Sequence, residues 1–192
     1  MRAFLAVPLP AAVRDACAAL QSRWYTAGVR ARWTPPENLH ITLHFLGEIA
    51  HGATAQLAPM LAPAVVRVAT AHIAIRGTGA FPDGPQPRVL WAAIEDPAGC
   101  LASLHEAAAH VLAQQNFRVE ARPYTPHITL ARLVPGAGAG PVAGQLAHTE
   151  EALLGSTDVT AVVLSESRLK PQGAEPRPLY RFPLATAAHG TD

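Results

Sequence analysis

The four-residue sequence His-Ile-Thr-Leu occurs twice in this chain, at residues 40–43 and 127–130. Each copy follows a proline-containing turn and begins an apolar run that is typical of a strand. Side chains alternate faces along a strand, so the His and Thr of each copy point one way while the Ile and Leu point the other. The repeat therefore predicts two equivalent strands, each presenting an imidazole beside a hydroxyl on the face opposite the core.

The pattern of strands and helices around these copies also runs through roughly twice, which predicts an α+β chain with two similar halves. The strands are expected at 1–7, 39–46, 70–76, 88–95, 127–133, 157–164 and 179–184, and the helices at 10–28, 52–66 and 96–115. The strands at 70–76 and 88–95 are expected to pair antiparallel across a turn-rich loop.

Prolines and glycines interrupt two segments of this pattern. Pro59 and Pro63 should kink or break the helix at 52–66. The run Gly136-Ala-Gly-Ala-Gly140 has the composition of a flexible linker. We expect one bilobal domain over residues 1–185, with a disordered tail at 186–192.

The composition is that of a folded and weakly charged protein. Hydrophobic residues make up 49% and charged residues 15%, against about 25% charged in an average globular protein, which excludes disorder as the main state. The formal net charge is +1, which excludes a protein whose affinity comes from covering many phosphates. Any recognition of phosphate must therefore be local.

The cysteines and the hydropathy of the sequence indicate the cellular compartment in which the protein is expected. Cys17 and Cys100 lie far apart and the sequence shows no signal peptide, which predicts a reducing cytoplasm. No apolar stretch approaches the roughly 20 residues of a membrane helix. We therefore expect a cytoplasmic protein, a monomer, with no membrane partner.

Two imidazoles set across one groove would support acid–base chemistry. Histidines with pKa values of about 6.5 can share one proton at neutral pH, one serving as general base and the other as general acid. The neighbouring hydroxyls can donate to the non-bridging oxygens of a phosphate. These groups cover activation, leaving-group protonation and charge stabilisation, so no metal and no other cofactor is expected.

One pattern imitates a metal site. His105 and His110 stand in a His-Glu-Ala-Ala-Ala-His sequence like that of a zinc-protease helix. That motif needs histidines four residues apart on one face, and here they are five apart and diverge. The sequence therefore predicts no metal ligands in this helix.

Long stretches around the two copies resemble the 2H phosphoesterase superfamily, and within it the RNA 2′,3′-cyclic phosphodiesterases, which are also called 2′-5′ RNA ligases. The matching stretches are 2–8, 32–48, 88–91 and 123–132, with a weaker match at 164–167 and 180–184. The resemblance implies an α+β, bilobal, pseudo-two-fold-symmetric LigT-like fold, in which two antiparallel sheets line a central groove with helices outside. It also implies hydrolysis of a terminal 2′,3′-cyclic phosphate on RNA to a 2′-phosphate, with possible reversal to form a 2′-5′ bond.

Carried over from this resemblance, His40 is the proton donor to the leaving 3′ oxygen and His127 is the proton acceptor that activates water. Thr42 and Thr129 hold the phosphate oxygens. The assignment of acid and base rests on the family, because sequence does not separate two equivalent imidazoles. The expected partners are RNA ends that carry a 2′,3′-cyclic phosphate, and nucleotides.

Three further residues are candidates for substrate binding. Arg132 matches a ligand-binding position of the family, but strict alternation puts it on the face opposite His127 unless the strand ends or bulges before it. His44 shares the face of His40 and Thr42, so it either touches the substrate or lines the rim of the groove. Tyr124, like Trp33 and Trp91, either stacks on a base or packs beside a turn; Phe4 and Phe45 are expected in the core.

Two other functions remain open from the sequence. The same chemistry could act on a small cyclic nucleotide such as ADP-ribose 1″,2″-cyclic phosphate. The chain could instead be a module that binds nucleotides without catalysis. Both catalytic copies are intact, which favours an enzyme over the binding module.

Overall fold

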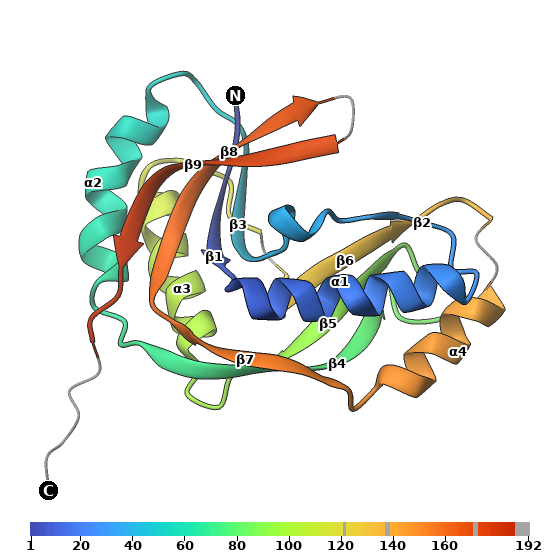
Figure 1. Cartoon of the computed structure of the whole chain (residues 1–192). Coiled ribbons are helices and arrows are strands. Elements are labelled where there is room, and N and C mark those ends of the chain that lie inside the picture. Colours follow the sequence, from blue (N-terminus) through green and yellow to red (C-terminus); the bar gives the residue numbers. More distant parts are fainter. Residues whose placement is uncertain (121, 137–138, 171–172, 187–192) are drawn as a thin grey trace, which may run out of the picture.

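The computed structural model describes residues 1–192 except 121, 137–138, 171–172 and 187–192 (Figure 1). Its strands are β1 (Arg2–Pro8), β2 (Ala31–Trp33), β3 (His40–Glu48), β4 (Ala71–Phe81), β5 (Val89–Glu95), β6 (His127–Leu133), β7 (Leu153–Val159), β8 (Ala161–Lys170) and β9 (Gly173–Pro183). Its helices are α1 (Ala11–Thr26), α2 (Ala53–Val65), α3 (Cys100–Gln114) and α4 (Ala139–Thr149), with a short 3-10 helix η1 (Pro36–Asn38). The elements expected before residue 134 are all present, although β4 runs on to Phe81.

In the described part of the chain, nine strands form one curled antiparallel sheet in the order β7-β4-β5-β6-β3-β1-β8-β9, with β2 paired to β6 (Figure 1). Apart from β2, the sheet consists of two halves of four strands each, β7-β4-β5-β6 and β3-β1-β8-β9. Strands β6 and β3 join them through a single pair of opposed residues, Ile41 and Ile128. The expected α+β fold is confirmed, with its two sheets meeting edge to edge at this point.

Two of the helices, α1 and α3, cross between the halves. Helix α1 follows β1 in the chain but packs against β7 in the other half of the sheet, and α3 follows β5 but packs against β3. Local sequence fixes the ends of these helices. Gly28 adopts a φ of 87° just after α1, which favours glycine, and the Asp96 carboxylate accepts the backbone N–H groups of Cys100 and Leu101 at the start of α3.

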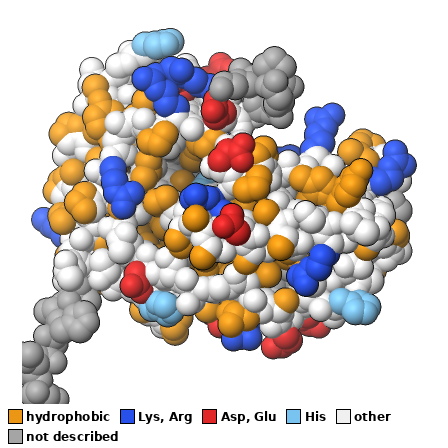
Figure 2. Space-filling view, viewed as in Figure 1, with side chains coloured by type: hydrophobic (Ala, Val, Ile, Leu, Met, Phe, Trp, Pro, Cys, Tyr) orange, Lys and Arg blue, Asp and Glu red, His pale blue; other side chains and the backbone are white. Residues whose placement is uncertain are grey.

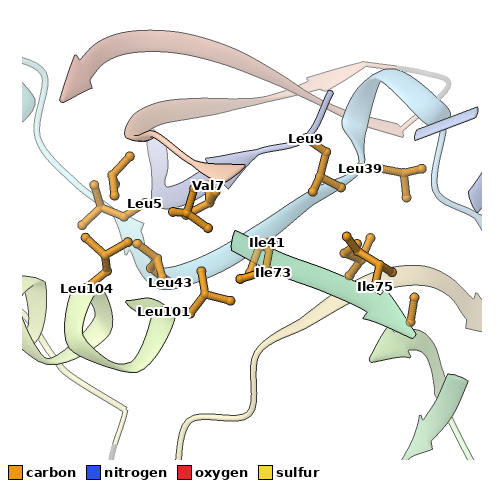
Figure 3. Close-up of a cluster of buried hydrophobic side chains, with 14 of the residues drawn as sticks. Leu5, Val7, Leu9, Leu39, Ile41, Leu43, Ile73, Ile75, Leu101 and Leu104 are labelled. Atoms are coloured by element: carbon orange, nitrogen blue, oxygen red, sulfur yellow. The ribbon is translucent and has the colours of Figure 1, made fainter. Parts of the chain in front are cut away.

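The core lies between the sheet and the helices that cover it. Apolar side chains from β1, β3, β4 and α3 meet there, including Leu5, Val7, Ile41, Leu43, Ile73, Ile75, Leu101 and Leu104 (Figure 3). Phe4 is buried as expected. The two His-Ile-Thr-Leu copies, 40–43 and 127–130, are called the repeated words from here on. Their Ile and Leu side chains are buried as well, so the alternation that the repeat predicts is confirmed on the core side.

The expected strand at 157–164 is wrong, because the chain divides there into β7 and β8 around residue 160. Strand β7 pairs with β4, whereas β8 pairs with β1 in the other half. The run has no glycine or proline to mark the break. The chain turns here because the two strands join different halves of the sheet. Local sequence does not show this.

The expectation of a flexible linker at residues 136–140 is also wrong in part, because helix α4 begins at Ala139. Contacts with the rest of the fold, rather than the helix propensity of its residues, stabilise this helix. Val142 is buried, and the Thr149 hydroxyl lies 2.7 Å from the hydroxyl of Thr78 on β4. Of the tail expected at 186–192, residues 187–192 lie outside the described residues.

Helix α2 continues through Pro59 and Pro63, so of the expected kink or break, the break is wrong. Both prolines lie on the exposed side of the helix. The carbonyl groups one turn earlier, which lose their N–H partners, therefore face water. None of the described helices is long and apolar enough to span a membrane.

Candidate active site

The two repeated words lie side by side at the junction of the half-sheets. Ile41 and Ile128, both fully buried, oppose each other in an antiparallel register. That register sets His40 across from Thr129 and Thr42 across from His127, on the face opposite the two isoleucines. Two imidazoles and two hydroxyls thus surround one local two-fold axis.

Each imidazole is oriented by a backbone carbonyl two residues earlier in the chain. The Nδ1–H of His40 donates to the Asn38 carbonyl at 2.7 Å, and that of His127 donates to the Thr125 carbonyl at 2.8 Å. A carbonyl can only accept, so this contact assigns the proton to Nδ1 in the neutral ring. In both rings Nε2 is left as the nitrogen able to exchange a proton with a substrate.

The two rings have different surroundings. His40 stacks on Phe4, with 4.8 Å between ring centroids, whereas His127 meets Phe81 edge-on at 5.2 Å. Burial lowers the pKa of His40 below 6.5; the Asn38 carbonyl opposes this shift and the nearby His127 adds to it. The charged form of His40 is therefore disfavoured until a negative group arrives beside it.

Two hollows flank the paired words. The larger, about 740 Å³, is lined by Thr42, His127 and the rings of Phe45 and Phe81, with Arg88 and Arg122 at its edge. The smaller, about 360 Å³, lies on the other side and is lined by His40, Phe4 and Tyr180 among others. On the face in Figure 2, basic and acidic side chains are interspersed among hydrophobic ones, in keeping with the low net charge.

A one-residue bulge interrupts each repeated word at its leucine. On β3, Thr42 opposes Ala6 and His44 opposes Leu5, so Leu43 has no partner. On β6, Thr129 opposes Trp91 and Ala131 opposes Leu90, which leaves out Leu130. Beyond each bulge the alternation of faces is shifted by one residue.

The bulge on β3 moves two residues from their expected faces. His44 is only 5% exposed, and its Nε2–H donates to the His105 carbonyl on α3 at 2.8 Å. The expectation that it shares the face of His40 is therefore wrong, although it borders the larger hollow from the core side. Phe45, expected in the core, is 66% exposed and takes the groove face instead.

The bulge on β6 resolves the position of Arg132. Strict alternation would turn this residue away from His127, but the shift at Leu130 returns it to the groove face, where it is exposed. It is not among the residues that line the larger hollow. By position in the two words, Arg132 is the counterpart of Phe45.

Tyr124 belongs to a stack of three rings under the larger hollow. The ring of His105 lies between His44, at 4.1 Å, and Tyr124, at 4.3 Å. The Tyr124 hydroxyl donates to the Thr42 carbonyl at 3.1 Å. Burial raises the pKa of Tyr124 well above 10, with Asp96 adding to the shift, so the hydroxyl remains a donor at physiological pH.

A model of the family described as LigT like Phosphoesterase matches residues 7–91 and again residues 94–180. The chain belongs to this family. The expected resemblance is confirmed, and the two matches divide this LigT-like phosphoesterase into the same two halves as its repeated word.

Two relatives of this LigT-like phosphoesterase have the same name. The RNA 2′,3′-cyclic phosphodiesterase of Aeropyrum pernix is 31% identical over 160 residues, or 83% of this chain and 90% of that protein. The protein of the same name from Methanothermobacter thermautotrophicus is 31% identical over 180 residues, or 94% and 95%. The expected enzyme class is confirmed at the level of a phosphoesterase.

Solved structures share the fold of this LigT-like phosphoesterase. The protein TT0787 of Thermus thermophilus superposes with a TM-score of 0.81 at 29% identity, covering 97% of this chain and 100% of that one. LigT of E. coli complexed with 3′-AMP superposes with a TM-score of 0.76 at 24% identity, covering 95% and 97%. The second likeness concerns the fold alone.

Sequence reasoning missed several residues around the site of this LigT-like phosphoesterase. Asn38 orients His40, and its position between the proline turn and the first repeated word is the signal that could have found it. Gln21 is 6% exposed and stands on the apolar stripe of α1 that includes Cys17 and Trp24. A lone amide on such a stripe indicates a buried polar contact.

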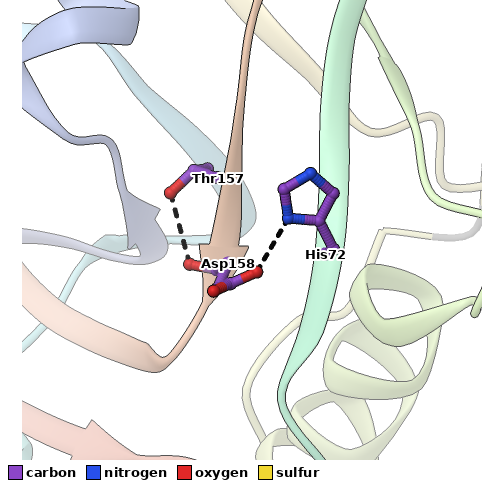
Figure 4. Close-up of polar contacts among 3 residues, drawn as sticks. All are labelled: His72, Thr157 and Asp158. Atoms are coloured by element: carbon purple, nitrogen blue, oxygen red, sulfur yellow. Dashed lines mark hydrogen bonds and ion pairs between the residues drawn. The ribbon is translucent and has the colours of Figure 1, made fainter.

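Other polar residues lie apart from the groove. His72 on β4 and Asp158 on β7 lie in hydrogen-bond contact, with 2.8 Å between Nδ1 and a carboxylate oxygen, and both side chains are exposed (Figure 4). This pair ties an edge strand to its neighbour. Within the part of the chain that the structure describes, no group of three or more His, Cys, Asp or Glu side chains could hold a metal ion.

Proposed function

We propose that this LigT-like phosphoesterase hydrolyses a terminal 2′,3′-cyclic phosphate on RNA to a 2′-phosphate. The observation that carries the proposal is the antiparallel pairing at Ile41 and Ile128, which brings two His and two Thr side chains around one axis. The relatives named RNA 2′,3′-cyclic phosphodiesterase support the choice of substrate.

In this mechanism His127 is the proton acceptor and His40 is the proton donor. His127 Nε2 takes a proton from water as the water oxygen bonds to phosphorus, and His40 delivers a proton to the 3′ oxygen as the P–O3′ bond breaks. Phosphorus keeps its bond to O2′, so the product is a 2′-phosphate. The substrate charge offsets the effect of burial on His40 and favours its protonated form.

Thr42 and Thr129 stabilise the charge that develops on the non-bridging oxygens. Each stands across from the histidine of the other strand, so a phosphate on the local axis has one donor from each half. Donors aimed at a developing charge in a partly dry site contribute strongly to rate. The proposal needs no metal ion, because proton transfer and charge stabilisation are both covered by side chains.

The larger hollow suits the nucleotide and the RNA beyond the cyclic phosphate. Phe45 and Phe81 offer rings for a base, and Arg88 and Arg122 offer charge for a phosphate. We keep Arg132 as a proposed substrate-binding residue for a phosphate further along the chain. His44 and Tyr124 shape the hollow from the core side. LigT of E. coli, which shares this fold, has been solved in complex with 3′-AMP.

We also propose binding partners, an oligomeric state and a cellular localisation for the enzyme. RNA ends and nucleotides are the proposed partners, and we propose a monomer that works in the cytoplasm as one domain over residues 1–185. A related ligation, in which a 5′-hydroxyl attacks phosphorus in place of water and forms a 2′-5′ bond as the P–O3′ bond breaks, uses the same proton transfers. An oligonucleotide with a 5′-hydroxyl tests it in the same assay.

The test uses an oligoribonucleotide ending in a 2′,3′-cyclic phosphate, incubated with the purified protein and EDTA. We expect a 2′-phosphate, identified by chromatography against 2′- and 3′-phosphate standards. His40→Ala and His127→Ala should each lower kcat by about 10²- to 10⁴-fold, while His72→Ala, which changes an exposed histidine outside the groove, should retain activity.

Four outcomes oppose the proposal. Loss of activity in EDTA contradicts metal independence, and a 3′-phosphate product contradicts the assigned donor. An untouched oligonucleotide combined with hydrolysis of ADP-ribose 1″,2″-cyclic phosphate would move the function to small cyclic nucleotides. Nucleotide binding in calorimetry without hydrolysis of either compound would identify a binding module.

A further inference from the structure

The seam between the two half-sheets has little backbone pairing to hold it. Strands β3 and β6 are opposed only at Ile41 and Ile128 among the described residues, and beyond that pair they separate. Carbonyl groups on the facing edges then need other partners, because an unpaired buried carbonyl is costly. On this edge of β6 the backbone of β2 and Thr34 supplies some of them, and two side chains supply others.

Gln21 closes the seam on one side. Its amide Nε2 donates to the Leu130 carbonyl on β6 and to the Thr34 carbonyl, each at 2.8 Å. Leu130 is the bulged residue three positions after His127, and Thr34 lies in the segment that leads into His40. The Thr34 N–H itself donates to the Leu130 carbonyl at 2.9 Å, and the buried amide of Gln21 adds a second link between the chain before the first histidine and the strand that carries the second.

Tyr124 closes the seam on the other side in the same way. Its hydroxyl donates to the Thr42 carbonyl at 3.1 Å, next to the bulge on β3. Tyr124 lies three residues before His127, and Thr42 lies two residues after His40. The stack on His105 holds the ring so that its hydroxyl reaches across.

We propose that Gln21 and Tyr124 are positioning residues that set the separation of the two repeated words, and with it the spacing between the His40 and His127 imidazoles. Tyr124 reaches from the segment before His127 to the strand of His40. Gln21, on α1, joins the segment before His40 to the strand of His127. The inference rests on the proposed function, since it gives this spacing a catalytic purpose. Displacing a catalytic group by about 1 Å can cost about a hundredfold in rate.

Two variants remove only the tying atoms. Gln21→Met keeps the length of the side chain and loses the amide, and Tyr124→Phe keeps the ring stack and loses the hydroxyl. The matched controls are Cys17→Ala, one turn earlier on the same buried face of α1, and Tyr25→Phe, which changes an exposed tyrosine. Stability is measured for all four, so that general loosening of the fold is separated from loss of the tie.

The first readout is independent of activity. Histidine Cε1–H signals are followed by NMR against pH. Loosening the seam moves His127 away from His40 and admits water, and both changes raise the pH at which His40 titrates. We expect this rise in Gln21→Met and Tyr124→Phe and not in the controls. An unchanged His40 titration in both variants overturns the proposal.

The second readout is steady-state kinetics on the cyclic-ended oligonucleotide. Each variant should lower kcat about tenfold or more with KM changed less than twofold, because the acid and base are misplaced while binding contacts remain. A fall in kcat of the same size in an equally destabilised Cys17→Ala protein would reduce Gln21 to a structural residue. If the wild-type protein fails to hydrolyse the substrate, the proposed function fails, and the NMR titration alone decides the positioning role.

Discussion

The imidazole of His40 lies against the ring of Phe4, with 4.8 Å between their centroids and 25° between their planes. Phe4 is 6% exposed, so this contact removes one face of the imidazole from water. Burial is the first cause of the lowered pKa of His40. The ring of Phe4 thus helps to make the proposed proton donor a stronger acid than an exposed histidine.

Replacing Phe4 by alanine should move the pH profile of the enzyme. Water would enter beside His40 and raise its pKa towards 6.5. The donor must be protonated, so kcat/KM falls as pH rises through the pKa of His40 in the free enzyme. We expect this falling limb to lie at higher pH in Phe4→Ala. Phe182→Ala, which removes a ring of equal exposure elsewhere, should leave the limb in place; a limb that does not move in Phe4→Ala contradicts the assignment of His40 as donor.

Removal of either threonine hydroxyl should lower kcat. Thr42→Val and Thr129→Val keep the shape of the side chain and lose a donor to the phosphate, for which we expect about a hundredfold loss each. Thr42→Ser and Thr129→Ser keep the hydroxyl and serve as controls near wild-type activity. Steady-state kinetics on the cyclic-ended oligonucleotide measures all four. Full activity in both valine variants would show that the hydroxyls do not contact the phosphate.

Phe45 should contribute to substrate affinity. Its ring is 66% exposed and borders the larger hollow, where it can stack on a base of the RNA. A stacked base is worth about 1 to 3 kcal/mol, so Phe45→Ala should raise KM about tenfold with little change in kcat. Phe45→Tyr preserves the stacking face and should retain the wild-type KM. An unaltered KM in Phe45→Ala would place the base elsewhere.

Folding stability should decline in mild acid because of buried histidines. His40, His44 and His105 all have pKa values lowered first by burial. The folded protein therefore binds protons less readily than the unfolded chain, and the stabilisation that is complete above pH 6.5 is lost as pH falls through the folded-state pKa values.

Urea unfolding as a function of pH measures this effect. His44→Gln keeps a donor for the His105 carbonyl but does not titrate, so the difference in unfolding free energy between neutral and mildly acidic pH should shrink. His110→Gln, a change on the same helix as His105 but outside the buried stack, serves as the control. An identical pH dependence in His44→Gln and the wild type would exclude His44 as a source of the acid sensitivity.

The sequence was sufficient to predict the repeated strands, their buried isoleucines and the family. It did not reveal the bulges at Leu43 and Leu130, because a bulge depends on how the neighbouring strand is registered. Only Arg132 indicated a bulge from the sequence, because its expected role in ligand binding conflicted with the strict alternation of faces along a strand. The exposed position of Phe45 and the buried position of His44 both follow from the bulge at Leu43.

Contacts between distant segments escaped prediction for a similar reason. Gln21 binds the Leu130 carbonyl, 109 residues away in the chain, and no local pattern specifies such a partner. The break between β7 and β8 and the presence of α4 are likewise fixed by tertiary pairing. Local sequence specified which residues face the core, whereas the fold as a whole specified what they meet there.

The central position of β1 in the sheet has a consequence for how the protein is made. Residues 2–6 pair with residues 163–167 on β8, so β1 leaves the ribosome well before the strand that pairs with one of its edges. Pairing over such a long stretch of chain is slow, and an unpaired strand edge is prone to association with other chains. During synthesis, β1 and β3 therefore form a half-finished sheet edge, and completion of that edge by β8 is the step most exposed to aggregation.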